Sequence, residues 1–210
     1  LTFSEIFQPG PLINSSVPLP ETLSNSTHMK FVLITPFTQG SGFRIPRPFA
    51  MGPQDNRYSV TLTRQYYLQT TPVTQGQWNI VMGKKPSHFQ GSDQLPVEHI
   101  TWDECQEFIR RINTLNEGVY RLPTEAEWEF ACQANHSGPY FFGPQPENLK
   151  NYAWYEDNAQ EKTHIVGQLE PNPFGLLDIY GNVWEWCFDY YASFPQEHAT
   201  NPKGPESGKR

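Results

Sequence analysis

The residues with the clearest chemical potential lie in the stretch 174–189. Asp178 precedes the pair Gly181-Asn182, which readily enters tight or left-handed turns. In the following Trp184-Glu185-Trp186, an extended backbone would place both indoles on one face and the carboxylate on the other. An acid, a turn and this short strand together predict a compact structural element that a bound metal ion stabilises. The stretch shows no nucleophile, general base or phosphate-binding loop.

Three acidic residues form a second candidate group. Glu125, Glu127 and Glu129 could serve acid–base chemistry or hold a metal. They follow Thr124 at an expected helix start, and the helix dipole favours negative charge in a first turn. We therefore favour a structural role for these carboxylates over a catalytic one.

A third candidate is the loop at residues 151–158, where acids and amides alternate with aromatic rings. Such a loop can ligate a hard cation through side-chain and backbone oxygens. A plain solvated loop fits this composition equally well.

The cysteines and histidines do not form a recognisable site. Cys105, Cys132 and Cys187 are odd in number, and their spacing matches no zinc motif, so we expect buried reduced thiols. The six histidines are scattered and are expected to be structural or exposed. The nucleophile elbow, the phosphate loop, the dinucleotide fingerprint and the His-Glu-x-x-His motif are all missing from the sequence.

Composition restricts the class of protein further. The formal net charge is -7 and no Lys/Arg cluster is present, which argues against nucleic acid as a partner. The longest apolar runs are too short to span a membrane. With 20 prolines, 15 glycines and an aromatic content of 14%, the chain is expected to form an α+β domain with an irregular backbone held by aromatic packing.

Periodicity predicts few regular elements. Residues 1–28 have the composition of a linker or a draped N-terminal segment, so ordered structure is expected to begin at Lys30. Strands are predicted at 30–34, 58–63 and 66–68, with a long loop over 35–57.

Helices are predicted to begin after Thr74, Thr101 and Thr124, which have the residue types of N-caps. The second and third of these starts also have the form of a capping box. Gly83 is expected to end the first helix, and the second is expected to run to about Asn116.

Four motifs occur in order along the chain. They are Pro-Val-Glu-His-Ile-Thr-Trp-Asp-Glu (96–104), Tyr-Arg-Leu-Pro-Thr-Glu-Ala-Glu-Trp-Glu-Phe-Ala-Cys (120–132), Pro-Asn-Pro-Phe-Gly-Leu-Leu-Asp-Ile-Tyr-Gly-Asn-Val-Trp-Glu-Trp (171–186) and Asn-Pro-Lys-Gly-Pro-Glu-Ser-Gly (201–208). Together they resemble the sulfatase-modifying-factor family, which contains the formylglycine-generating enzymes. The resemblance implies a C-type-lectin-like α+β fold, loop-rich and low in regular secondary structure. It also implies that residues 29–210 are the family domain without its C-terminal closing segment.

The resemblance implies one bound ligand for this chain, a calcium ion. By similarity, the Asp178 side chain and the backbone carbonyls of Ile179, Gly181 and Val183 would form one site, with the oxygen ligands that a hard cation requires. A plain turn cap on Gly181 is the alternative role for Asp178. A second family site maps in part onto Asn158 and the backbone of Gln160, where Trp154 stands in place of the expected amide.

Copper cannot be assigned to any residue of this sequence. In the oxidase members of the family, a copper-binding cysteine pair follows the turn that corresponds to residues 201–205, and here the sequence stops at Arg210. Cys132 matches a family cysteine that forms a disulfide in some members.

Three functions remain open at this stage. The first, which we favour, is a non-catalytic, calcium-stabilised domain that binds a protein or small-molecule ligand, as hypervariable ligand-binding members of the family do. The second is a copper- and dioxygen-dependent formylglycine-generating oxidase whose cysteine pair lies beyond Arg210. The third is an accessory domain of a larger enzyme. We also expect a companion C-terminal fragment after Arg210 to cover open sheet edges.

Overall fold

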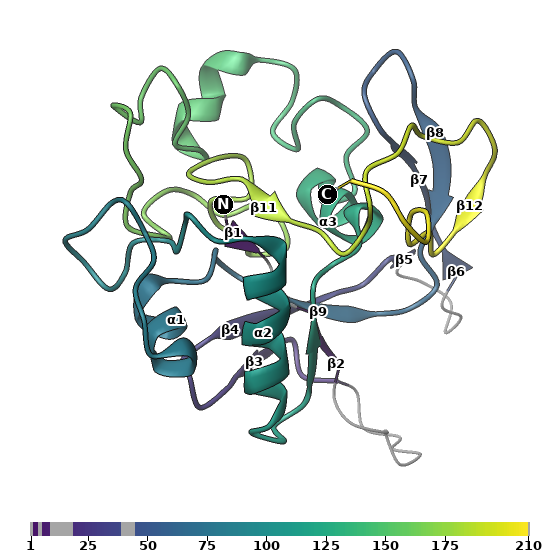
Figure 1. Cartoon of the computed structure of the whole chain (residues 1–210). Coiled ribbons are helices and arrows are strands. Elements are labelled where there is room, and N and C mark those ends of the chain that lie inside the picture. Colours follow the sequence, from purple (N-terminus) through teal and green to yellow (C-terminus); the bar gives the residue numbers. More distant parts are fainter. Residues whose placement is uncertain (1, 4–5, 9–18, 39–44, 210) are drawn as a thin grey trace.

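The computed structural model describes residues 2–3, 6–8, 19–38 and 45–209. Short strands and helices are joined by long irregular segments, which confirms the expected loop-rich α+β architecture (Figure 1). The strands are β1 (Thr2–Phe3), β2 (Ile6–Gln8), β3 (Thr22–Ser24), β4 (Lys30–Ile34), β5 (Phe37–Thr38), β6 (Ile45–Pro46), β7 (Pro48–Met51), β8 (Tyr58–Thr61), β9 (Tyr66–Gln69), β10 (Val119–Arg121), β11 (Glu185–Trp186) and β12 (Ala199–Thr200). The helices are α1 (Gln75–Met82), α2 (Trp102–Asn113), α3 (Glu125–Gln133) and the 3-10 helix η1 (Pro146–Asn151).

The largest sheet has the strand order β10-β2-β9-β4-β3, and its neighbouring strands run antiparallel. A smaller sheet has the order β12-β8-β7, in which β12 runs parallel to β8. β1 pairs with β11, and β5 pairs with β6. The strands predicted at 30–34 and 66–68 are therefore confirmed as β4 and β9, and they lie side by side in the centre of the domain.

Side chains of β4 and β9 alternate between two hydrophobic cores, as the two-residue period of a strand requires. Phe31 and Tyr67 point into the first core, whereas Ile34, Tyr66 and Leu68 point into the second. The central sheet is thus buried on both faces.

The first core lies between the sheet and the helices α1 and α2, which lie next to each other in Figure 1. The Trp78 and Phe108 rings stack across the two helices with centroids 5.0 Å apart. On α2, the buried residues recur at helical spacing and form one apolar stripe. They are Cys105, Phe108, Ile109 and Ile112.

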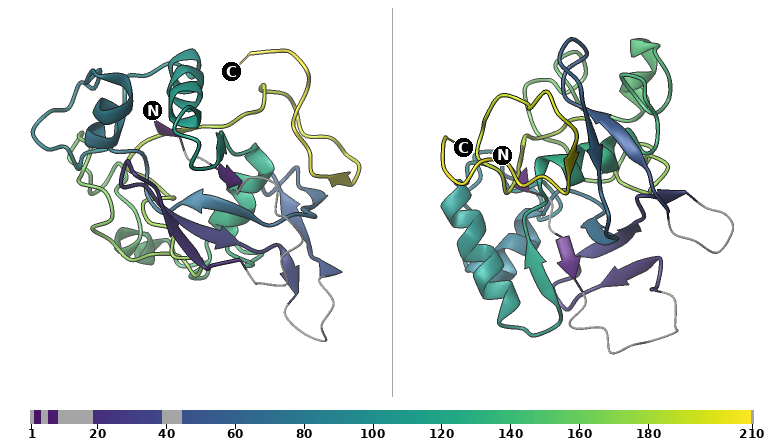
Figure 2. Two further views of the ribbon diagram at one scale, coloured as in Figure 1. Left: turned by 90° about the horizontal axis from the view of Figure 1, so that it is seen from below. Right: turned by 90° about the vertical axis from the view of Figure 1, so that its right-hand side faces the viewer.

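The second core joins α3, the smaller sheet and the loops near residue 176. Phe130 of α3 packs there with Val60 of β8 and with Leu176. Both views of Figure 2 show the C-terminal segment, in yellow, at one edge of the molecule beside α3. This arrangement brings the start of α3 next to residues that are far away in the sequence.

Capping boxes begin all three predicted helices. The Thr74, Thr101 and Thr124 side chains each accept a hydrogen bond from the N3 backbone, and the N3 side chain accepts one from the backbone N–H of the threonine. Gly83 ends α1 in the left-handed conformation, as expected. α2 ends at Asn113, three residues before the predicted end at Asn116, because the Asn113 side chain exchanges two hydrogen bonds with the Tyr120 backbone and turns the chain into β10.

Two sequence expectations about loops are wrong. Ordered structure begins before Lys30, since β3 pairs with β4 through its backbone and needs no hydrophobic pattern of its own. The expected loop at 35–57 contains β7, which pairs along its length with β8. Pro48 and Gly52 bound β7 and concealed it, but proline is tolerated there because β7 is an edge strand. Much of the predicted N-terminal segment, residues 1, 4–5 and 9–18, lies outside the described residues.

In the described part of the chain, no helix combines the length and the hydrophobicity of a transmembrane segment.

Candidate functional site

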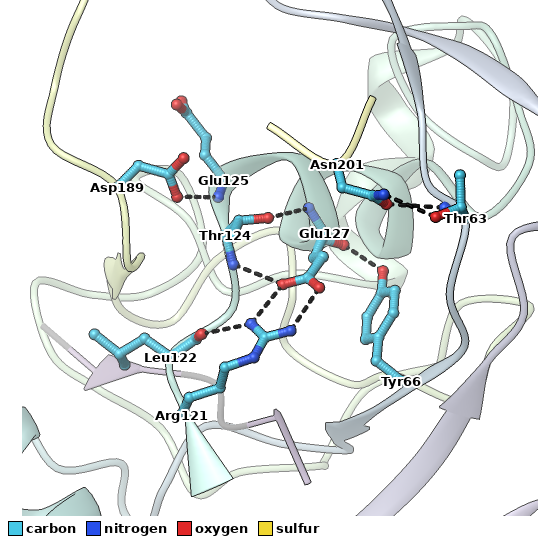
Figure 3. A network of polar contacts seen from close by, with 9 residues as sticks. All are labelled: Thr63, Tyr66, Arg121, Leu122, Thr124, Glu125, Glu127, Asp189 and Asn201. Atoms are coloured by element: carbon cyan, nitrogen blue, oxygen red, sulfur yellow. Dashed lines mark hydrogen bonds and ion pairs between the residues drawn. The ribbon is translucent and has the colours of Figure 1, made fainter. Parts of the chain in front are cut away.

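The start of α3 is fixed by a network of charged hydrogen bonds (Figure 3). The Glu127 carboxylate accepts from the Thr124 backbone at 2.9 Å and from both terminal nitrogens of Arg121 at 2.7 and 2.8 Å. The Tyr66 hydroxyl donates to the Glu127 carbonyl at 2.6 Å. Since every Glu127 oxygen has a donor, this residue holds β10, β9 and α3 together, and the structural role favoured for it is confirmed.

Glu125 lies beside another carboxylate, Asp189, that sequence spacing could not reveal. Asp189 accepts a hydrogen bond from the Glu125 backbone at 2.7 Å. Partial burial, and then the negative charges of Asp189 and Glu129, raise the pKa of Glu125 to about 7. Burial also raises the pKa values of Glu129 and Asp189. The expectation that all three glutamates occupy the first turn of α3 is wrong for Glu129, which lies beyond that turn.

No lysine or arginine in the described ranges forms an ion pair with Glu125, Glu129 or Asp189. Their negative charge is therefore offset only in part, by hydrogen bonds from Gly52 and Gln133 to Glu129 and by the more distant Arg57 and Arg121. The effect extends to Tyr58, whose pKa is raised to about 12 by burial and then by the same three carboxylates.

Two pockets open beside the start of α3. One, which we name the basic pocket, has a volume of about 320 Å³ and is lined by Arg64, Arg121 and Lys203 among others. The other, the acidic pocket, has a volume of about 380 Å³ and is lined by Glu125 and Asp189 together with aromatic rings. The segment Pro202-Lys203 borders both pockets, so their opposite charges lie close together.

The predicted metal residues surround a buried turn. Asp178 is 1% exposed and adopts a left-handed backbone conformation with φ 60°. Its Oδ2 accepts a hydrogen bond from the Gly167 backbone at 2.6 Å, whereas its Oδ1 is buried without a partner among the described residues. Burial raises the pKa of this carboxyl group. A buried carboxylate oxygen without a donor is costly, and a hard cation would satisfy it.

Gly181 and its neighbours make this turn tight. A Cβ on Gly181 would lie 2.2 Å from the Trp154 carbonyl oxygen, so only glycine fits. The Gly181 amide donates to the Asp178 carbonyl, and its own carbonyl accepts from Val183. Asp178, Ile179, Gly181 and Val183 therefore lie on one compact turn, and their oxygens are the donor type that a hard cation takes.

The second predicted group lies on an adjacent turn. The Asn158 side chain accepts from the Tyr155 backbone at 2.7 Å and donates to the Ala153 carbonyl at 2.9 Å. Gln160 follows in the left-handed conformation with φ 55°. Asn158 thus stabilises its own turn, and a cation would have to use the remaining lone pair of its Oδ1. Within the described residues, no group of three or more His, Cys, Asp or Glu side chains is arranged as a metal site.

Asn182 connects these two turns. Its side chain accepts from the His164 amide and donates to the His164 carbonyl, both at 2.9 Å. Its amide donates to the Trp154 carbonyl at 2.7 Å. The Trp154 indole in turn stacks on the His164 ring with centroids 3.8 Å apart. The loop around Asp178 is therefore braced on several sides.

The two tryptophans that follow do not share one environment, contrary to expectation. The Trp186 indole packs against the first core and donates to the Ile100 carbonyl at 3.1 Å. Trp184 is 83% exposed. The reason is that β11 covers only Glu185–Trp186, so Trp184 lies outside the extended strand. Tyr191 is 81% exposed and Phe188 is 40% exposed. Three aromatic side chains of residues 184–191 are therefore exposed between partly buried neighbours, and we name this stretch the exposed aromatic segment.

The cysteines are free thiols, as predicted. Cys105 and Cys132 are buried as expected, whereas Cys187 is only partly buried. Burial raises the pKa of Cys132 to about 12 and raises the pKa of Cys187 as well. Both side chains are thus held in the protonated form, which is a poor nucleophile and a poor metal ligand.

Fold and site together define a loop-rich α+β domain of the formylglycine-generating-enzyme type. The profile of the sulfatase-modifying factor enzyme 1-like domain matches residues 20–207, and the chain belongs to this family. The solved structure of Treponema denticola variable protein 1 superposes with a TM-score of 0.74 and 28% identity, covering 91% of this chain and 85% of that one.

Relatives in the family carry different names. The chaperone protein LppX of Paenibacillus barcinonensis is 31% identical over 199 residues, covering 71% of this chain and 68% of that protein. The formylglycine-generating enzyme of Mus musculus is 35% identical over 153 residues, covering 66% of this chain and 39% of the enzyme. The inactive C-alpha-formylglycine-generating enzyme 2 of Bos taurus is 29% identical over 151 residues, covering 67% of this chain and 48% of that protein. The chain thus spans about two-fifths of the mouse enzyme.

Proposed function

We propose that this chain is a non-catalytic, calcium-stabilised domain that binds a protein or small-molecule ligand through its loop-rich side. The observation that carries this proposal is the exposed aromatic segment, residues 184–191, with Trp184 and Tyr191 more than four-fifths exposed. Exposed tryptophan and tyrosine side chains are typical anchors of protein interfaces, since they supply a large contact area at a low entropic cost.

The residues that hold this segment in place favour a binding role. Trp186 is anchored in the first core, and the braced turn at residues 178–183 immediately precedes Trp184. An aromatic side chain that is carried by a rigid backbone loses less conformational entropy when a ligand binds to it. The segment is therefore presented in a preorganised form.

We propose that calcium stabilises the turn at residues 178–183, which supports this segment. The buried, unpartnered Oδ1 of Asp178 supports this assignment, together with the carbonyl groups of Ile179, Gly181 and Val183 on the same turn. A divalent cation there would offset the cost of the buried negative charge. For a second ion, Asn158 and Gln160 are the proposed ligands on the neighbouring turn.

Thiol chemistry and the relatives support a role other than oxidation. The high pKa values of Cys132 and Cys187 suit packing better than redox chemistry. One relative is named an inactive enzyme and another a chaperone protein. The likeness to a Treponema protein that is named variable suggests that ligand choice could vary within this fold.

Panning a displayed random-peptide library on the immobilised chain, in calcium, tests this function. We expect a consensus peptide whose affinity falls at least about tenfold in Trp184→Ala and in Tyr191→Ala, as for interface hot spots. Ile80→Ala changes an equally apolar exposed residue on α1 and is the matched control. Peptides that bind both aromatic variants as tightly as the wild type would contradict the proposal.

A second function is favoured by the 35% identity to the mouse formylglycine-generating enzyme. For that oxidase, the copper-binding cysteine pair would have to lie outside these 210 residues. The test is incubation of the chain, extended by whatever natural sequence follows Arg210, with a Cys-x-Pro-x-Arg peptide, copper and dioxygen, followed by detection of an aldehyde. We expect no aldehyde above the level of a protein-free control, and enzymatic turnover would replace the binding function with the oxidase.

A further inference from the structure

We propose that the basic pocket beside α3 binds a small anionic ligand through its carboxylate or phosphate group. This inference deepens the proposed binding function and rests on it, since Phe188 of the exposed aromatic segment also lines the pocket.

Of the described residues that line the basic pocket, three are cationic and Glu127 alone is a carboxylate. This balance is unusual for a chain with a formal net charge of -7. Glu127 is already satisfied by Arg121 and by the Thr124 backbone (Figure 3). The remaining two cations, Arg64 and Lys203, therefore set the charge that a ligand would meet.

Arg64 and Lys203 are available for a ligand. Both residues are exposed. Neither side chain forms a hydrogen bond or an ion pair with another residue in the part of the chain that the structure describes. An arginine and a lysine that converge on one pocket suit a carboxylate or a phosphate, since each donates charge-assisted hydrogen bonds to anionic oxygens.

The walls of the pocket are rigid. Tyr66 is hydrogen-bonded to the α3 backbone, and the Asn201 side chain is bonded to Thr63 at two points, 2.9 and 2.7 Å. Asn201 thereby fixes the segment that carries Lys203. A site whose walls are held in place before binding loses less entropy when the ligand arrives.

Size and lining indicate the rest of the ligand. A volume of about 320 Å³ lies at the lower end of the range for small-molecule sites. Leu62 and Phe188 add apolar surface to the charged rim. The ligand class is thus a small molecule with one anionic group and a compact apolar body.

The neighbouring acidic pocket limits the charge of that ligand. Glu125 and Asp189 lie on the other side of the Pro202-Lys203 segment and would repel additional negative charge. We therefore expect singly charged anions to bind at least as well as doubly charged ones of the same size.

The probes are benzoate, phenyl phosphate and neutral benzyl alcohol, which share one ring and differ in charge. Titration of the isotopically labelled full chain, followed by amide NMR, should show saturable shifts at Thr124 and Asn201 with an anion and none with benzyl alcohol. Whichever anion binds more tightly identifies the anionic group.

Two variants test the cations directly. Arg64→Gln and Lys203→Gln should each weaken anion binding by about three- to tenfold, the effect of one partly exposed charged contact. Lys150→Gln removes an exposed lysine from η1 and should leave affinity within about twofold.

The inference is overturned if neither anion gives saturable shifts at the pocket, if benzyl alcohol binds as well, or if Lys150→Gln weakens binding as much as the pocket variants do. Peptide binding through Trp184 is measured separately. Loss of anion binding with intact peptide binding would overturn this inference alone, and the reverse result would overturn the binding role of residues 184–191.

Discussion

Two regions of this domain reach a fixed structure by different physical means. In the first core, α1 and α2 pack against the central sheet through large apolar side chains such as Trp78 and Phe108. Between α3 and β11, residues 134–184 contain one regular element, η1, and follow an irregular path. There, asparagine and aspartate side chains hold the backbone by hydrogen bonds, with Asn182 and Asn158 as examples.

The difference shows where function can develop in this fold. Apolar packing ties each position of the first core to the shape of its neighbours, so substitutions there change stability. A loop held by a few side chain-to-backbone bonds needs only those residues, which leaves the intervening positions free to vary. The exposed aromatic segment follows this loop region directly.

The largest effect is expected at the first core. Trp78 is fully buried and stacks on Phe108, so Trp78→Ala should lower the free energy of unfolding by about 3–5 kcal/mol. Chemical denaturation measures this loss. Ile80→Ala, at an exposed position of the same helix, should change stability by less than about 0.5 kcal/mol. A small loss at Trp78 would show that the contrast between the two regions is wrong.

A single amide in the loop region should have the next largest effect. The Asn172 side chain is buried, accepts from the Phe174 and Leu176 amides, and donates to the Ala131 carbonyl at 2.8 Å. Asn172→Ala leaves buried backbone groups without partners and should lower the free energy of unfolding by about 2–4 kcal/mol.

The matched control for this loop substitution is Asn148→Ala. Asn148 is an exposed asparagine on η1, and its loss should cost less than about 0.5 kcal/mol. Equal losses in the two variants would mean that specific amides do not hold the loop region.

The smallest effect concerns the carboxylates at the start of α3. The native pKa of Glu125 is about 7 against an ordinary value of 4.5, so the native state holds this proton more tightly than the unfolded state does. The wild type therefore loses stability as the pH rises from about 4.5 through 7. Glu125→Gln should match the wild type near pH 4.5 and exceed it at pH 8, by less than about 1 kcal/mol because solvent screens this only partly buried carboxylate.

Thermal unfolding of wild type and Glu125→Gln at these two pH values measures the difference. Glu147→Gln, at an exposed position of η1, is the charge-matched control. A gain that is independent of pH would contradict the assigned interaction among Glu125, Glu129 and Asp189.

Most of the helices and longer strands could be predicted because their signals are local. Threonine caps at 74, 101 and 124 marked the starts of all three α-helices, a run of strand-forming residues marked β4, and two-residue alternation marked β8. The strand β7 was missed because proline and glycine at its ends are typical of loops, although both are tolerated at a sheet edge.

The candidate site could be predicted only where the sequence carries a compact motif. The turn at Asp178 was found because its residues are consecutive. Asp189 and Glu125 are 64 residues apart, and no pattern in the sequence links them. The same applies to Arg64 and Lys203, which meet only because the C-terminal segment returns to β9 and α3.

Amide hydrogen–deuterium exchange of the full chain, with calcium and with a chelator, tests the central claim most directly. If calcium stabilises the loop region beneath the aromatic segment, protection of residues 163–183 should rise about tenfold or more in calcium, equivalent to about 1.4 kcal/mol, while α1 and α2 stay unchanged. Asp178→Asn should abolish this gain, because it removes the charge and keeps the shape. Identical exchange in calcium and chelator, or an equal gain in the Asp178→Asn variant, would contradict a calcium-stabilised binding domain.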